Sequence, residues 1–101
     1  MRAWFIKQVR TGAVDQRLYR LEPPITYFRG RTEVVCPYVI VSAVARAFED
    51  DETFVLPANR AGEILGLREL PGSLYGECNH ERALTEAGYQ LQKEGAPPDQ
   101  E

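Results

Sequence analysis

The feature that most constrains the fold is an apolar stretch in the middle of the chain, Tyr38 to Ala45. Its two alternating sets of side chains are both largely apolar, since Val39 and Val41 belong to one set and Ile40 to the other. A strand that is apolar on both sides has to be covered on both sides. The stretch therefore predicts the central strand of a sheet, although the alanines in Ser42 to Phe48 leave a helix open there as an alternative.

Two further strands are predicted ahead of this one. Trp4 to Arg10 and Arg17 to Leu21 are short, partly aromatic and β-branched runs, and the six residues between them predict a hairpin. Pro23 and Pro24 cannot donate a ladder hydrogen bond, so we expect the second strand to end there. The following segment, Ile25 to Arg31, is then predicted to be a surface loop.

Short strands and turns are predicted after the central strand, and a helix follows them. Thr53 to Leu56 is a short strand closed by Pro57, and Pro71-Gly72 suits a type II turn. Asn79 is a favourable N-cap for the helix, and Gly95 is its predicted stop. One stripe of this helix collects small and apolar residues: Leu84, Ala87, Gly88 and Leu91.

These elements predict a single α+β domain over residues 1–95. In it a small, mainly antiparallel β-sheet carries the C-terminal α-helix on one face, through Leu84, Ala87 and Leu91. The chain of 101 residues, with 44% hydrophobic and 27% charged residues, has the composition of such a domain. Residues 96–101 have nothing to bury and are predicted to form a disordered tail.

Nothing in the sequence indicates export or membrane insertion. The N-terminal residues lack the apolar stretch of a signal peptide, and the longest apolar run, Val34 to Ala45, is too short to span a bilayer. We therefore expect a soluble, cytoplasmic protein. Cys36 and Cys78 are too few for a disulfide scaffold and are predicted to be free thiols.

The sequence contains no recognisable catalytic, metal or cofactor motif. It lacks a phosphate-binding glycine loop, a dinucleotide fingerprint and a nucleophile elbow. Cys78 and the sole histidine, His80, are close at the predicted start of the helix, where the helix dipole favours a thiolate. We favour the alternative, a solvated His80 and a packed Cys78, because no orienting group or oxyanion donor can be named. The expected protein is not an enzyme and uses no metal or cofactor.

Charge is divided unevenly along the chain. Residues 1–35 hold seven basic and three acidic side chains, a formal +4, whereas residues 36–101 hold five basic and twelve acidic ones, a formal −7. The acidic cluster Glu49 to Glu52 is contiguous rather than spaced as a cation site requires, so it is predicted to be a solvated loop.

The basic third of the chain interleaves arginines with aromatic residues, a combination enriched at protein interfaces. We expect a surface built from these residues to bind a protein and not to carry catalysis. Nucleic acid is the alternative partner, because cations also meet phosphates and rings also stack on bases, although the overall pI of 5.2 argues against it. The predicted binding residues are Arg17, Arg20, Tyr27, Phe28, Arg29 and Arg31.

Several strand and turn sequences resemble those of small uncharacterised proteins encoded by phages of actinobacteria. The residues that carry the resemblance are Tyr19 to Pro24, Tyr38 to Val44, Glu52 to Ala58, Leu70 to Ser73 and His80 to Leu84. Ten arginines against two lysines suggest a GC-rich coding genome, which agrees with it. The resemblance implies an accessory phage protein in the cytoplasm of the host cell that binds a host protein. It transfers no functional residue. The positive face on a negative molecule, in contrast, suits an acidic partner or a second copy of the same chain.

Overall fold

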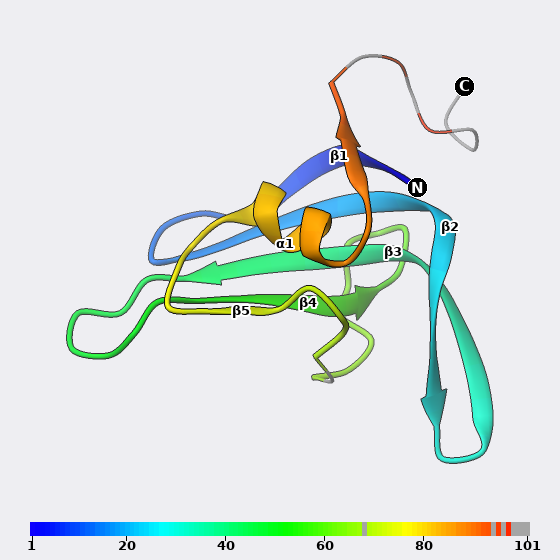
Figure 1. Cartoon of the computed structure of the whole chain (residues 1–101), viewed down its shortest axis with the longest axis horizontal. Coiled ribbons are helices and arrows are strands. Elements are labelled where there is room, and N and C mark those ends of the chain that lie inside the picture. Colours follow the sequence, from blue (N-terminus) through cyan, green and yellow to red (C-terminus); the bar gives the residue numbers. More distant parts are fainter. Residues whose placement is uncertain (68, 94, 96, 98–101) are drawn as a thin grey trace.

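The computed structural model describes residues 1–67, 69–93, 95 and 97. These residues form a curled six-stranded sheet with one short helix against it (Figure 1). The strand order is β5-β4-β3-β2-β1-β6, and each neighbouring pair is antiparallel except β1 and β6, which run parallel. The elements in chain order are β1 (Arg2–Arg10), β2 (Val14–Arg29), β3 (Thr32–Val44), β4 (Glu52–Ala58), β5 (Leu74–Tyr75), α1 (His80–Glu86) and β6 (Gln90–Gln92). The protein is therefore mainly β, with less helix than the expected α+β fold contains.

The central position predicted for the apolar stretch is confirmed, because β3 pairs with β2 on one side and β4 on the other. The side chains of β3 point alternately to the two faces of the sheet and belong to two apolar clusters. Val39 and Val41 join the larger cluster, which also contains Leu84 of α1, whereas Ile40 joins a smaller one with Leu18 of β2. The alternative of a helix after Ser42 is wrong, since β3 continues to Val44.

The helix is much shorter than the sequence predicted. Asn79 is its N-cap, as expected, and its side chain accepts a hydrogen bond from the backbone N–H of Arg82 (3.0 Å). The helix ends at Ala87 because Gly88 has a φ of 93°, a left-handed conformation that turns the chain out of the helix. Leu91 still packs on the larger cluster, but it does so from β6, beside β1.

The expected end of β2 at the two prolines is also wrong. The hairpin of β1 and β2 forms as predicted, but β2 runs on through Pro23, which follows a cis peptide bond, to Arg29. The register between β2 and β3 shifts between Arg20 and Ile25, so the prolines lie where the ladder is already interrupted and needs no donor from them. Residues 25–31, predicted as a loop, therefore belong to a hairpin.

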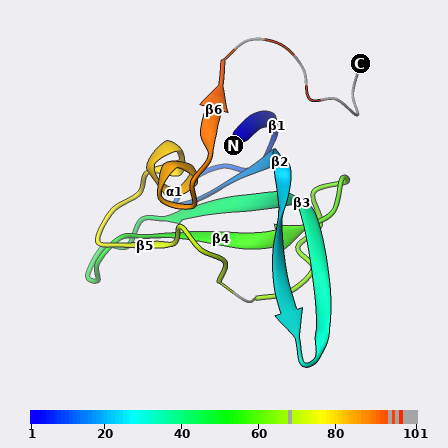
Figure 2. The same ribbon diagram turned by 45° about the vertical axis from the view of Figure 1, so that its right-hand side comes forward.

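We call the outer half of this hairpin, residues 25–36, the arm. Figures 1 and 2 show it bending away from the rest of the sheet and ending in the turn between β2 and β3. The loop between β3 and β4, residues 45–51, lies at the other end of the sheet in both views. The arm and this loop thus project from opposite ends of the sheet.

The outer edge of β4 is covered by β5 and by the irregular chain before it. The backbone N–H of Leu65 donates to Pro57 O (2.8 Å) and that of Leu70 to Val55 O (2.7 Å). The predicted turn at Pro71-Gly72 is present, with Gly72 at a φ of 105°. Most of the predicted tail, residues 96 and 98–101, lies outside the described residues. Among the described residues, no helix has the length and apolar character needed to cross a membrane.

Candidate functional site

The six predicted binding residues fall into two groups in the structure. Tyr27, Phe28, Arg29 and Arg31 lie together in the arm, whereas Arg17 and Arg20 lie in the first half of β2, within the body of the sheet. The predicted surface is therefore divided, and its arm portion, in which Phe28, Arg29 and Arg31 are exposed, is the part that stays together.

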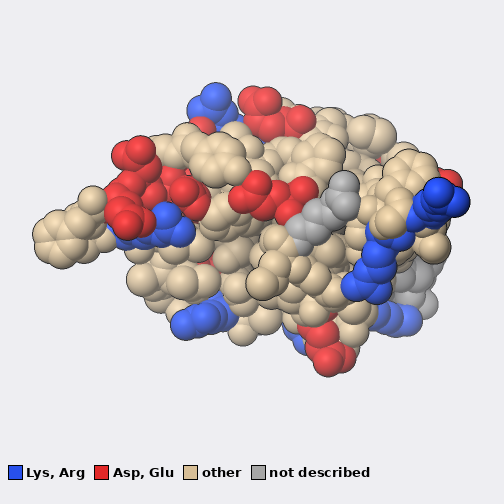
Figure 3. Space-filling view, turned by 90° about the horizontal axis from the view of Figure 1, so that it is seen from below, with Lys and Arg blue, Asp and Glu red and all other residues tan. Residues whose placement is uncertain are grey.

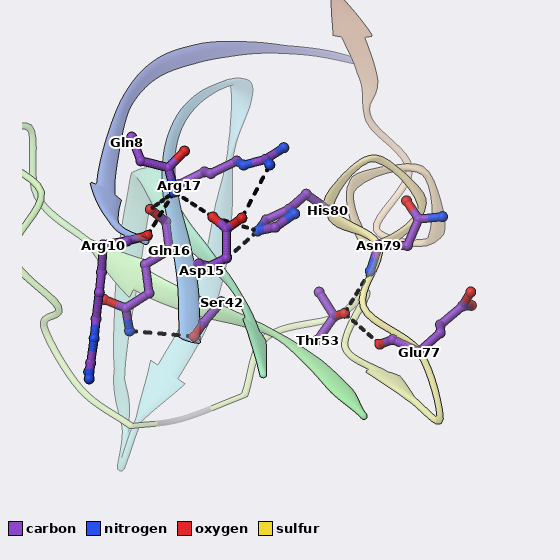
Figure 4. Close-up of polar contacts among 10 residues, drawn as sticks. All are labelled: Gln8, Arg10, Asp15, Gln16, Arg17, Ser42, Thr53, Glu77, Asn79 and His80. Carbon is purple, nitrogen blue, oxygen red and sulfur yellow. Dashed lines mark hydrogen bonds and ion pairs between the residues drawn. The ribbon is translucent and has the colours of Figure 1, made fainter. Parts of the chain in front are cut away.

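Arg17 belongs to a polar cluster between the sheet and the helix (Figure 4). Its Nη2 lies 3.3 Å from Asp15 Oδ2. Burial alone would raise the pKa of Asp15, but hydrogen bonds from Gln8 and Arg17 outweigh it and lower that pKa. Arg17 thus helps to fix the helix side of the sheet.

Arg20 also makes contacts within the sheet. Its guanidinium carbon lies 5.6 Å from the centre of the Tyr38 ring, a cation–π contact with the opposite residue of β3. It also donates a hydrogen bond to the backbone oxygen of Leu21. We therefore assign Arg20 a structural role and exclude it from the site.

The tip of the arm carries exposed basic and aromatic side chains. Phe28 is 58% exposed, and Arg29 and Arg31 flank the turn residue Gly30, whose φ of 64° suits glycine. Neither Arg29 nor Arg31 forms an ion pair with any other described residue. Tyr27 is half-buried and packs against the larger apolar cluster, which anchors the arm.

A hollow of about 320 Å³ lies beside the tip. Tyr27, Phe28 and Arg29 line one side of it. The other side is formed by Pro57 at the end of β4 and by Gly66 and Leu67. Leu67 is 86% exposed, so its side chain is accessible at the rim of the hollow.

We call this group, Tyr27, Phe28, Arg29, Arg31 and Leu67, the arm-tip surface. Sequence reasoning missed Leu67. The available signal was an apolar side chain next to Gly66 in a segment without strand or helix periodicity, which predicts exposure but not the neighbour that it meets.

Acidic and basic side chains are unevenly distributed over the face drawn in Figure 3. Acidic side chains cluster at the end that carries the β3–β4 loop, with others toward the middle, and basic side chains cluster at the end that carries the arm. This distribution follows only partly from the sequence, because two of the early basic residues pair with acids. Arg2 pairs with Glu22 (3.2 Å) and Arg17 with Asp15 (3.3 Å).

The environment of Cys78 and His80 does not favour a reactive thiolate. Partial desolvation of the exposed Cys78 thiol and the negative charge of Asp51 raise the pKa of this thiol. His80 is buried rather than solvated as expected, burial lowers its pKa, and its Nε2 donates to the backbone oxygen of Asp15 (2.9 Å). Nearby, buried Thr53 donates to Glu77 O and accepts from Asn79 N, which fixes the chain entering the helix (Figure 4).

Both cysteines are free. Cys36 is buried, whereas Cys78, which was expected to be packed, is exposed because it lies in the irregular chain before the helix. No group of three or more potential metal ligands is found within the described part of the chain.

Comparison of the chain with models of protein families, with curated proteins and with solved structures gives no match. The resemblance to phage proteins stays a prediction, and function has to be argued from the arm-tip surface itself.

Proposed function

We propose that this protein is a non-enzymatic binding module whose arm-tip surface holds an acidic segment of a partner protein. The segment would place an apolar or aromatic side chain in the hollow beside the arm. Its carboxylates would pair with Arg29 and Arg31.

The observation that carries this proposal is the combination of apolar exposure and uncompensated positive charge at one place. Exposed Phe28 and Leu67 border the same hollow, so two apolar side chains and a concave surface lie together at the arm. Arg29 and Arg31 add directional donors beside it that no other described residue neutralises. Aromatic and arginine side chains are the types that dominate binding energy at protein interfaces.

A protein partner agrees with the charge balance better than a nucleic acid does. Binding along a phosphate backbone needs several cations in a row, and each contact adds to the affinity. Arg17 and Arg20, which the predicted nucleic-acid surface required, are engaged elsewhere, and the arm itself also carries Glu33. Two arginines on an acidic chain suit a short acidic peptide segment.

The test is a selection of peptides on the purified protein. A displayed library of random twelve-residue peptides is selected on the wild type and on a double variant, Arg29→Ala with Arg31→Ala. The control is Arg60→Ala with Arg82→Ala, which removes the same charge from two exposed positions outside the hollow. A single-stranded and a double-stranded DNA oligonucleotide are assayed in parallel by fluorescence anisotropy.

We expect the wild type and the control to enrich peptides with an aromatic residue among acids, and the arm variant to lose them. Charge-assisted pairs of this kind contribute about 1.5–3 kcal/mol each, so loss of both should weaken binding at least tenfold or so. Enrichment that is the same on the arm variant would refute the proposal. Retention of DNA that depends on Arg29 and Arg31 would replace it with the nucleic-acid alternative.

A further inference from the structure

The loop between β3 and β4 has the chemistry that the arm-tip surface is proposed to bind. Phe48 at its tip is 100% exposed. Four consecutive carboxylates follow this ring, Glu49, Asp50, Asp51 and Glu52. An aromatic ring held fully in water beside several acids is an unfavourable arrangement for an isolated molecule, because a phenylalanine gains about 1.5–3 kcal/mol when it is buried.

Contacts within the loop hold its base and leave its tip projecting. Arg46 Nη1 lies 3.2 Å from Glu49 Oε2 and 3.4 Å from Glu52 Oε1. The backbone N–H of Arg46 also donates to Asp51 Oδ1 (3.2 Å). Residues 46–52 nevertheless keep a formal charge of −3, with four acids against one base. The loop therefore presents an apolar ring with net negative charge behind it.

We infer that the partner of the arm-tip surface is the β3–β4 loop of a second copy of this chain, with Phe48 entering the hollow beside Phe28 and Leu67. The inference rests on the proposed function and names its partner. The residual negative charge of the loop faces Arg29 and Arg31 in this arrangement, so the two surfaces are complementary in charge as well as in apolar character.

The positions of the two surfaces decide the kind of assembly. The loop and the arm project from different ends of the molecule (Figures 1 and 3), so one copy cannot fill its own hollow. The contact joins unlike surfaces, because each copy offers one loop and one arm to other copies. Such contacts repeat into rings or open chains when the loop and the arm of one copy bind different neighbours, and they close into a symmetric dimer when two copies exchange loops.

The size of the contact sets its strength. One loop tip in one hollow covers far less than the roughly 1,200–2,000 Å² that stable interfaces bury. We therefore expect association that is reversible and visible only at high concentration. Because exposed ion pairs contribute to it, salt should weaken it: the screening length falls from about 14 Å at about 50 mM salt to about 4 Å at about 500 mM.

The experiment uses two variants that each disable one half of the contact. The loop variant is Phe48→Ser, and the arm variant is Arg29→Ala with Arg31→Ala. Both change exposed side chains and should leave the fold intact, which circular dichroism checks. Control proteins are Tyr75→Ser, which removes another exposed ring, and the Arg60→Ala, Arg82→Ala protein. Sedimentation velocity over a concentration series gives the mass of each species.

We expect the mass of the wild type and of both controls to rise with concentration at low salt and to fall back at high salt. Each variant alone should associate at least tenfold or so more weakly, which corresponds to about 1.4 kcal/mol. An equimolar mixture of the two variants is the decisive sample. The loop variant keeps an unchanged arm-tip surface, and the arm variant keeps an unchanged β3–β4 loop. One molecule of each can therefore form a single contact, so the mixture should form dimers and nothing larger.

Several results would overturn the inference. A wild type that stays monomeric at all concentrations, a loop variant that associates as the wild type does, or a mixture that forms no dimer each excludes this contact. If peptide selection on the arm nevertheless succeeds, the proposed function stands and its partner is a different acidic protein. If peptide selection fails while the mixture forms dimers, the arm recognises the folded loop and not a free acidic segment, and the proposed function has to be withdrawn in its general form.

Discussion

Gly72 controls how closely the helix approaches the sheet, and its replacement by alanine should be severely destabilising. The residue lies in the turn before β5 with a φ of 105°. A Cβ built there would overlap the backbone oxygen of Ala83 in α1 and come within 2.9 Å of Ala87 Cβ. Two costs therefore add: backbone strain for a non-glycine residue at positive φ, and steric overlap with the helix.

Gly12 allows these costs to be separated. It has the same φ of 105°, but a Cβ at Gly12 would meet no atom within 4 Å. Gly12→Ala should therefore show the backbone strain alone, about 1–2 kcal/mol. Gly72→Ala should show that strain plus about 1–3 kcal/mol for overpacking, since the helix has to move away from the turn.

Urea unfolding measured by fluorescence is the suitable assay, because Trp4 is the sole tryptophan and is only 6% exposed. We expect the free energy of unfolding to fall by about 2–5 kcal/mol in Gly72→Ala, and by clearly less in Gly12→Ala. Failure of Gly72→Ala to fold while Gly12→Ala folds would agree with the same reasoning. Equal losses in the two variants would refute it, because the contact with the helix would then cost nothing.

Two titratable sites give further predictions. Burial lowers the pKa of His80 below its ordinary value of about 6.5, so below that pH the unfolded chain takes up a proton that the folded chain resists. The urea concentration at the unfolding midpoint should therefore decrease as the pH is lowered from about 7.5 to about 5.5, a range above the titration of Asp15. His80→Gln should flatten this dependence. A midpoint that rises on acidification contradicts the assignment. The raised pKa of the Cys78 thiol predicts that iodoacetamide modifies it more slowly than glutathione at neutral pH, and buried Cys36 should react only on unfolding. Mass spectrometry of partially modified protein measures both rates, and Cys78 reacting faster than glutathione would be inconsistent with its surroundings.

The body of the sheet could be predicted from the sequence because buried positions there are occupied by apolar residues in a recognisable pattern. The two-sided apolar pattern of Tyr38 to Ala45 follows from a strand that is covered on both sides, and it placed β3 at the centre. The N-cap at Asn79 could also be predicted from the sequence, because an N-cap depends on one side chain and its immediate neighbours.

The errors arose where spacing alone is ambiguous. Leu84 and Leu91 are seven residues apart, which suits two turns of one helix, but Gly88 ends the helix and β6 returns Leu91 to the same core. Pro23 and Pro24 predict the end of β2 because proline lacks a donor, yet a register shift at this point makes the donor unnecessary.

The candidate site could be predicted only in part for a related reason. Tyr27, Phe28, Arg29 and Arg31 are close in sequence, so any hairpin or loop brings them together. Leu67 reaches them only through the tertiary arrangement of β4 and the chain after it, which no local pattern encodes. The separation of Arg17 and Arg20 from the site depends likewise on their partners, Asp15 and Tyr38.

The pairing of β1 with β6 has a consequence for how the protein is made on the ribosome. β1 is translated first, but the strand that covers its outer edge at Arg2 to Trp4 is translated after every other strand of the sheet. An uncovered strand edge is a template for pairing with other chains. During synthesis the edge of β1 at Arg2 to Trp4 therefore stays unpaired until β6 has been made. A product that ends before Gln90, released from a stalled ribosome, would keep this edge open and be prone to aggregation.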